Sequence, residues 1–312
     1  MVKNPNTQHE DLVSALNDIR ARTGSASNEP SEAVVKLGLL PYITKLLDNS
    51  TGILIPIYEI ISNIASTTYD NTLSLIKEKI HLKLIKALMQ STNPETQDQI
   101  LWGLCNIAGS GIEGRNELLK AGLVPQLIRM LSQVSIKSGL LQRLAWAMAN
   151  LCKWSPPAPF NEIRAFIPYM NMILRTSDTP AITQSLWGLA YITNRRTENM
   201  KQLTEFISLA TVVELVTHKD VEVAGPALKI IGNVCTGDES DVELVLASNG
   251  AAALAYIIIQ GNHPCLIREA CWVLSNVATG PRHHIEEILG FFPILSELAV
   301  KSSNTKVFFL II

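Results

Sequence analysis

The sequence carries no excess of positive charge. Its 312 residues include 26 Lys and Arg and 28 Asp and Glu, which gives a formal net charge of −2. Proteins that bind DNA or RNA through phosphates usually gather basic residues on one face, and the sequence contains no such basic stripe. We therefore expect no nucleic-acid partner.

Long apolar runs are lacking as well. No uninterrupted stretch reaches the roughly 18 apolar residues that a membrane-spanning helix requires. The N-terminal sequence MVKNPNTQHEDLV is polar and does not resemble a signal peptide. We expect no membrane partner.

Cysteine is scarce and odd in number. The five cysteines lack the paired spacing of a disulfide framework, and reduced thiols of this kind are typical of the cytoplasm and the nucleus. Three of them lie within two residues of a repeated Asn, so we expect them in helix packing: Cys105, Cys152 and Cys235.

A long internal repeat dominates what is present. Six segments end a helical pattern with Asn or Tyr, four residues after a position that is usually Trp. The first positions fall at 59, 102, 146, 187, 229 and 272, so the steps are 43, 44, 41, 42 and 43 residues. A repeat of this length is typical of a stacked helical array. The paired residues are Glu59 with Asn63, Trp102 with Asn106, Trp146 with Asn150, Trp187 with Tyr191, Lys229 with Asn233, and Trp272 with Asn276.

A second pattern lies between these pairs. Gly-x-x-Pro occurs at 38–41, 122–125 and 290–293, each time between two apolar helical runs. Gly suits the left-handed residue that ends a helix, and Pro suits the first turn of the next helix. Each unit is therefore expected to hold a short helix, a Gly-Pro turn, a middle helix and a third helix with the Trp-Asn pair. Three helices in 40 to 47 residues is the armadillo arrangement.

The expected fold is all-α, a right-handed superhelical solenoid of about seven armadillo repeats that form one domain over residues 1–312. Residues 301–312 are expected to be either a partial eighth repeat or a tail that packs back on the last unit. The expected units lie near 9–48, 49–90, 91–134, 135–175, 176–217, 218–259 and 260–300.

The Trp-Asn pairs have two interpretations. Gln99, Trp102, Asn106 and Ser110 are spaced three, four and four residues apart, so they share one face of a helix. For a single pair, the simpler interpretation is that Trp packs in the core and Asn bonds to a neighbouring backbone group. That interpretation weakens over six units, because an unpaired buried amide costs about 1–3 kcal/mol each time. An open groove removes this penalty.

Such a groove suits an extended peptide. An Asn amide offers a donor and an acceptor and can pair with the N–H and C=O of one peptide residue. Indole rings between the amides form slots for alkyl side chains, and a cationic end over a ring adds about 0.5–2 kcal/mol. The sequence therefore predicts a ligand rich in Lys and Arg.

The order of the variant repeats resembles importin-alpha, the armadillo adaptor of nuclear import, from about residue 35 to 300. The resemblance rests on Asn106-Ile-Ala-Gly109, on Asn150-Leu-Cys152 followed by Pro156 to Pro159, on Tyr191, on Lys229 with Gly232-Asn-Val-Cys-Thr-Gly237, and on Trp272 with Asn276.

The resemblance implies an adaptor of the cytoplasm and nucleus that binds cargo proteins with basic nuclear localisation signals, without a catalytic residue, metal or cofactor. It implies a major peptide site at Asn63, Gln99, Trp102, Asn106, Trp146, Asn150 and Trp187. It implies a minor site at Asn233, Glu239, Glu269, Trp272 and Asn276, and Lys229 as an ion-paired spacer between the two sites.

The sequence also departs from the family. The first twenty residues lack the basic segment that binds importin-beta, so we expect no importin-beta binding by that route. Ser110 and Gln184 stand where the family has Asp, and Glu59 stands where the first Trp is expected. Arg143 and Arg195 lie on the stripe that should attract cations. The armadillo fold predicts a monomer, although the apolar residues 308–312 argue against one.

Two alternatives remain. A scaffold of the armadillo type could use the same groove for a partner other than a localisation signal, and the missing acids and the groove cations favour it. An enzyme is disfavoured. His283 and His284 are the only His pair, and adjacent residues point about 100° apart on a helix, which makes a poor metal site.

Overall fold

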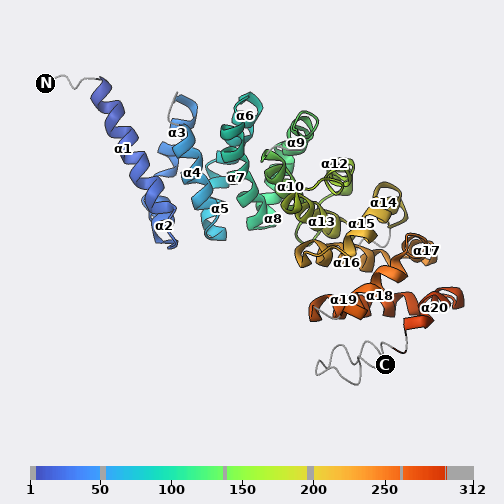
Figure 1. Cartoon of the computed structure of the whole chain (residues 1–312). Helices are drawn as coiled ribbons and strands as arrows, with labels where there is room; N and C mark the ends of the chain where they lie inside the picture. The colour runs from blue at the N-terminus through green and yellow to red at the C-terminus, as the bar shows by residue number, and fades with distance from the viewer. Residues whose placement is uncertain are drawn as a thin grey trace. The chain divides into compact units, whose positions relative to one another are not determined.

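The structure is a computed structural model that describes residues 5–49, 54–135, 139–194, 200–260, 263–291 and 293. Every regular element within these ranges is a helix (Figure 1). The predicted all-α fold of repeated helices is therefore confirmed. The chain divides into two compact units, one up to Ile163 and one from Arg164 on.

The first unit begins with one long helix and continues with three groups of three helices (Figure 1). The third helix of each group packs on the third helix of the group before it, so α1, α4, α7 and α10 follow one another through the core. The helices are α1 (Pro5–Thr23), α2 (Glu29–Lys36), α3 (Leu40–Asn49), α4 (Leu54–Ala65), α5 (Tyr69–Lys77), α6 (Ile80–Gln90), α7 (Pro94–Ser110), α8 (Ile112–Lys120), α9 (Leu123–Leu131), α10 (Leu140–Cys152) and α11 (Phe160–Ile163).

The second unit repeats the same arrangement. Its third helices α13, α16 and α19 pack on one another in that order. The elements are η1 (Arg164–Phe166), α12 (Ile167–Ile173), α13 (Thr179–Thr193), α14 (Met200–Phe206), α15 (Leu209–Val216), α16 (Val221–Val234), α17 (Glu239–Ala247), α18 (Gly250–Gln260), α19 (Pro264–Ala278), α20 (Arg282–Ile288) and η3 (Leu289–Phe291).

The expected repeat boundaries are wrong by one helix. The Trp-Asn helix closes each group, so a repeat begins at residue 29, 69 or 112 and not at 9, 49 or 91. Within the described ranges, six groups are flanked by α1 at one end and α20 at the other. The handedness of the superhelix and the single domain over 1–312 stay predictions, and residues 301–312 lie outside the described part.

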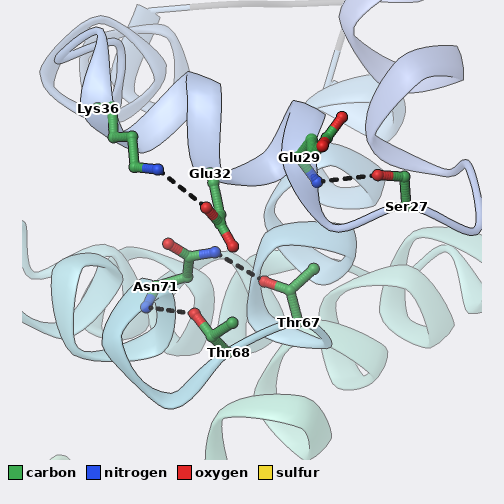
Figure 2. A network of polar contacts seen from close by, with 7 residues as sticks. All are labelled: Ser27, Glu29, Glu32, Lys36, Thr67, Thr68 and Asn71. Atoms are coloured by element: carbon green, nitrogen blue, oxygen red, sulfur yellow. Dashed lines mark hydrogen bonds and ion pairs between the residues drawn. The ribbon is translucent and has the colours of Figure 1, made fainter.

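Local side-chain chemistry sets where the helices begin. Thr68 Oγ1 accepts a hydrogen bond of 3.3 Å from the backbone N–H of Asn71, which caps the N-terminus of α5. Figure 2 shows this cap beside a second bond, 2.8 Å from Asn71 Nδ2 to Thr67 Oγ1. In the same view, Ser27 accepts from the backbone of Glu29 where α2 begins. Polar side chains thus accept backbone N–H groups where α2 and α5 begin.

The Gly-Pro turns form as expected at two places. Gly38 and Gly122 have φ values of 69° and 77°, in the left-handed region that ends a helix. After α2, Leu39 N–H bonds to Val34 O at 3.1 Å and Gly38 N–H bonds to Val35 O at 3.0 Å. Lys79 and Asn249 take the same conformation before α6 and α18, at φ 57° and 65°. The turn therefore recurs where the sequence lacks glycine.

No single described helix is long and apolar enough to cross a membrane. Only α17 and α18, a pair bent by 68°, pass that test together by length and composition.

Candidate peptide-binding groove

Part of the repeated Trp-Asn pattern of the first unit lines one polar hollow of about 400 Å³. Asn106, Trp146 and Asn150 all contribute to its wall, together with Ser110 and the end of α4 at 65–68. Trp102 and Trp146 are partly exposed and lie on the third helices α7 and α10. The structure therefore brings residues predicted for the major site to one surface.

The repeated Trp-Asn positions along the third helices are called the ladder from here on. In the first unit, the Asn side chains of the ladder bond to the helix that precedes theirs in the core. Asn106 Nδ2 donates to Ser62 O at 2.9 Å, and Asn150 Nδ2 donates to Cys105 O at 2.9 Å. In both cases the acceptor is the carbonyl of the residue just before the Asn of the previous repeat. Asn63 Nδ2 donates to Thr23 Oγ1 of α1 at 3.3 Å. The simpler interpretation, an amide bonded to a neighbouring backbone group, is thus correct for one N–H of Asn106 and one N–H of Asn150.

The other half of each amide remains open. An Asn side chain has two N–H donors and an oxygen acceptor. Within the described residues, the Oδ1 atoms of Asn106 and Asn150 accept no hydrogen bond. The bond to the preceding helix fixes the orientation of the amide, and one N–H and the oxygen stay available for a peptide group.

The slot between the two indoles holds a side chain of the protein itself. The Arg143 guanidinium carbon lies 5.8 Å from the ring centroid of Trp102 and 5.5 Å from that of Trp146. Asp98 holds the guanidinium in a two-point ion pair, with Nε–Oδ1 at 3.0 Å and Nη2–Oδ2 at 3.2 Å. The expectation of an open slot for a ligand cation is therefore wrong at this position.

Other predicted positions at this end also have internal partners. Glu59, which stands where the first Trp was expected, pairs with Arg20 of α1 at 3.3 Å. Ser110 Oγ donates to Ile107 O at 2.9 Å. Gln99 is half-buried, and its Oε1 atom is buried without a hydrogen-bond partner. The groove cation Arg195 lies outside the described residues.

In the second unit, Trp187 stacks on Tyr191 of the same helix. The ring centroids are 5.8 Å apart and the planes differ by 28°. Burial raises the pKa of the Tyr191 hydroxyl. Asn233, which is 6% exposed, donates from Nδ2 to Ala190 O at 3.1 Å and to Thr193 Oγ1 at 3.0 Å. The inter-repeat amide bond of the first unit is therefore repeated here.

Lys229 has the ion pair expected of it. Its Nζ lies 2.8 Å from Glu269 Oε1 and 4.7 Å from the ring centroid of Trp272. The indole fits against α16 because Gly232 has no side chain: a Cβ there would lie 2.2 Å from Trp272 Cζ3. Asn276 Nδ2 is buried without a partner. Glu269 and Trp272 are thus engaged by a cation of this chain.

Glu239 lies in a different polar cluster. It begins α17, and its Oε1 is 4.0 Å from His283 Nε2 of α20. Among the described residues it forms no hydrogen bond or ion pair with Trp272 or Asn276. The structure therefore gives no direct contact between Glu239 and the other predicted minor-site residues.

Comparison with known proteins agrees with this arrangement. The model of the armadillo/beta-catenin-like repeat matches residues 112–153, which is the span of α8, α9 and α10. A crystal structure of an engineered protein superposes with a TM-score of 0.86 at 22% identity, over 97% of this chain and 73% of that one. The chain thus contains a match to one armadillo repeat at residues 112–153, within an all-α array of repeated helices.

Importin alpha subunits are among the proteins whose sequences are similar to this chain. Importin subunit alpha-1b of Oryza sativa subsp. japonica is 24% identical over 262 residues, 83% of this chain and 49% of that protein. Importin subunit alpha-7 of Arabidopsis thaliana is 28% identical over 264 residues, 84% and 50%. The probable importin subunit alpha-A of Dictyostelium discoideum is 26% identical over 240 residues, 72% and 44%. The chain spans about half the length of these curated relatives.

Sequence reasoning missed two residues of the armadillo groove. Asp98, which holds Arg143, precedes Trp102 by four residues, and its acidic side chain on the ladder face was the available signal. Arg115 is 2% exposed, and its Nη1 donates to Lys153 O at 2.9 Å and to Pro156 O at 2.8 Å. It holds the loop at the edge of the hollow, and nothing in the repeat pattern marks it.

Proposed function

We propose that this protein binds an extended peptide along the ladder of its third helices. The observation that carries the proposal is the pre-oriented amide: Asn106 and Asn150 each use one N–H on the preceding repeat and leave an N–H and an oxygen open. A peptide residue presents one donor and one acceptor, so each ladder amide can pair with it without first losing rotational freedom.

We infer further that the peptide is a segment rich in Lys and Arg, such as the nuclear localisation signal of a cargo protein. The partly exposed indole of Trp187, and those of Trp102 and Trp146 once a ligand displaces Arg143, offer contacts for alkyl stems and faces for cationic ends. The importin alpha subunits among the relatives support this ligand class. The protein is then a nuclear import adaptor present in the cytoplasm and the nucleus.

This proposal includes no catalytic role and no cofactor, and the reported relatives carry no enzyme name. It includes a monomer in solution, as proposed for armadillo arrays in general.

A second candidate is an armadillo scaffold for a partner that is not a basic signal. Three ion pairs within the ladder favour it: Arg20 with Glu59, Arg143 with Asp98, and Lys229 with Glu269. Each ion pair occupies an acidic side chain that could otherwise have attracted a cation of the ligand. A mixed or acidic peptide would not have to compete with Arg143 for the indoles. An acidic side chain of such a peptide would instead lie against the Arg143 guanidinium between the two indoles.

Fluorescence anisotropy of a labelled Lys-rich localisation peptide tests the first proposal, with a Lys-to-Ala peptide as the ligand control. The double variant Trp102→Ala/Trp146→Ala should weaken binding, since two cation–ring contacts contribute about 1–4 kcal/mol, or about fivefold to several hundredfold. Tyr42→Ala is the matched control, because this aromatic side chain is 69% exposed and lies outside the ladder.

The outcomes separate the two candidates. Loss of binding in the double variant but not in Tyr42→Ala supports the adaptor. Undiminished binding by the double variant contradicts any role for the ladder. Equal binding of the Lys-rich and Lys-to-Ala peptides contradicts selection of a basic signal and favours the scaffold.

A further inference from the structure

The cluster that includes Glu239 is separate from the ladder. Glu239 and Glu243 lie one turn apart on α17, and His283 and His284 lie in the first turn of α20. Each of the four side chains offers one ligand atom, and these atoms all lie within 4.8 Å of one another. The cluster thus joins two helices of successive repeats within the second unit.

The two histidines converge, contrary to the sequence-based expectation. Their ring centroids lie 4.4 Å apart with planes at 69°, although adjacent helical residues start about 100° apart. His283 Nε2 lies 3.4 Å from Glu243 Oε1, and His284 Nε2 lies 4.0 Å from the same oxygen. Side-chain torsions bring both rings toward α17, which spacing along the chain could not reveal.

His284 gives a second, independent observation. Its side chain is fully buried, and neither Nδ1 nor Nε2 has a hydrogen-bond partner among the residues that the structure describes. Buried polar atoms are normally paired, because leaving them unpaired costs free energy. Gly280 closes off the other side of the ring: a Cβ there would lie 2.5 Å from Nδ1. The Nε2 atom, with its free lone pair in one tautomer, points into the cluster toward Glu243.

We propose that Glu239, Glu243, His283 and His284 bind a zinc ion. Two imidazoles and two carboxylates form a donor set that suits Zn²⁺. With bonds of about 2.0–2.2 Å, tetrahedral ligand atoms lie about 3.4 Å apart, so separations of up to 4.8 Å have to shorten by up to about 1.4 Å. Glu239, Glu243 and His283 are more than half exposed and can rotate inward. His284 is the fixed member around which they close.

The neighbouring cation Arg282 has another partner, so the ligands can move toward a bound ion. Arg282 pairs with Glu286, with Nε–Oε1 at 2.8 Å, so this cation is directed away from Glu243. With four protein ligands the site is closed, and a closed site stabilises the fold. The ion would link α17 of one armadillo repeat to α20 of the next and strengthen that end of the array.

The test uses the full-length, tag-free, metal-stripped protein with Cys265→Ser, which removes the exposed thiol. Isothermal titration with Zn²⁺ alone should give one site, and the melting temperature should rise with Zn²⁺ concentration. Co²⁺ in its place should give the absorption of a tetrahedral nitrogen and oxygen site.

Two conservative variants at exposed positions report on the ligands without risk to the core. Glu243→Gln and His283→Gln should each weaken Zn²⁺ binding by at least the roughly 10–100-fold that loss of an orienting group costs. Glu287→Gln on α20 and His263→Gln at the start of α19 are matched controls, because both residues are exposed and outside the cluster. Both control variants should bind Zn²⁺ with wild-type affinity, and this result would support the proposed site. No binding, or binding that neither ligand variant weakens, would overturn the proposal and show an adventitious ion only.

Discussion

Replacing Arg143 by Ala should make the groove a better receptor for a basic peptide. In the wild-type protein the guanidinium lies against both Trp102 and Trp146 and pairs with Asp98. A ligand Lys that enters this slot must first displace Arg143 from all three groups. In the variant, the same three groups face an empty slot and can receive the ligand directly.

The magnitude follows from these contacts. Each cation–ring contact at a partly exposed site contributes about 0.5–1 kcal/mol. The Arg143 and Asp98 side chains are 27% and 33% exposed, so their ion pair adds only about 0.2–1 kcal/mol. Part of the total is offset by the side-chain entropy that the ligand loses. We expect a gain of about 1–2 kcal/mol, or about 5–30-fold tighter binding.

Fluorescence anisotropy with the Lys-rich peptide and its Lys-to-Ala control measures this gain. Arg143→Met is the matched control, because it releases Asp98 while a long side chain still fills the slot. Tighter binding by Arg143→Ala than by Arg143→Met assigns the effect to the indole slot. A folded Arg143→Ala variant with unchanged or weaker affinity for the Lys-rich peptide would refute the reasoning.

Three further predictions concern packing and pH. Arg115→Met should lower the free energy of unfolding by about 2–5 kcal/mol in urea titrations, because it removes the hydrogen bonds that the buried Arg115 guanidinium donates to the carbonyls of Lys153 and Pro156; the exposed Arg129→Met should not, and equal stabilities would contradict the anchoring role. Gly232→Ala should cost about 1–3 kcal/mol and alter Trp fluorescence, because its Cβ would lie 2.2 Å from Trp272 Cζ3; an unchanged spectrum would show that the indole is not held there. Burial lowers the pKa of His81 below 6.5, and the negative charge of Glu117 acts in the opposite direction. The neutral His81 therefore contributes fully to stability above about pH 6.5, and this contribution is lost as the pH falls through the lowered pKa. His81→Gln should flatten the fall of melting temperature below that pH, and an unaltered profile would rule the residue out.

The sequence predicted the ladder and its face correctly because these features are local. Residues three and four apart share one side of a helix, so Trp102 and Asn106 had to lie together once that segment was helical. The Gly-Pro turns followed from backbone preferences at Gly38 and Gly122. The residues at which each repeat begins were harder to predict. A periodic pattern determines the number of residues per repeat but not which helix is the first of the repeat.

Partners across repeats could not be predicted from the pattern. Arg143 lies 45 residues from Asp98, and its position in the slot depends on how closely α7 and α10 pack. The bond from Asn150 to Cys105 O spans the same separation. Both depend on side-chain torsions and interhelical distances, which the spacing of residue types leaves undetermined.

The sequence by itself determined the all-α repeat architecture and the face that carries the Trp-Asn pairs, because helical periodicity and turn preferences act over a few residues. Tertiary structure alone decided that Arg143 fills the indole slot, that Asn106 and Asn150 keep only part of their bonding capacity open, and that His283 and His284 converge on two glutamates of α17. These outcomes require helices some forty residues apart to reach contact distance, and only the packed core sets that distance.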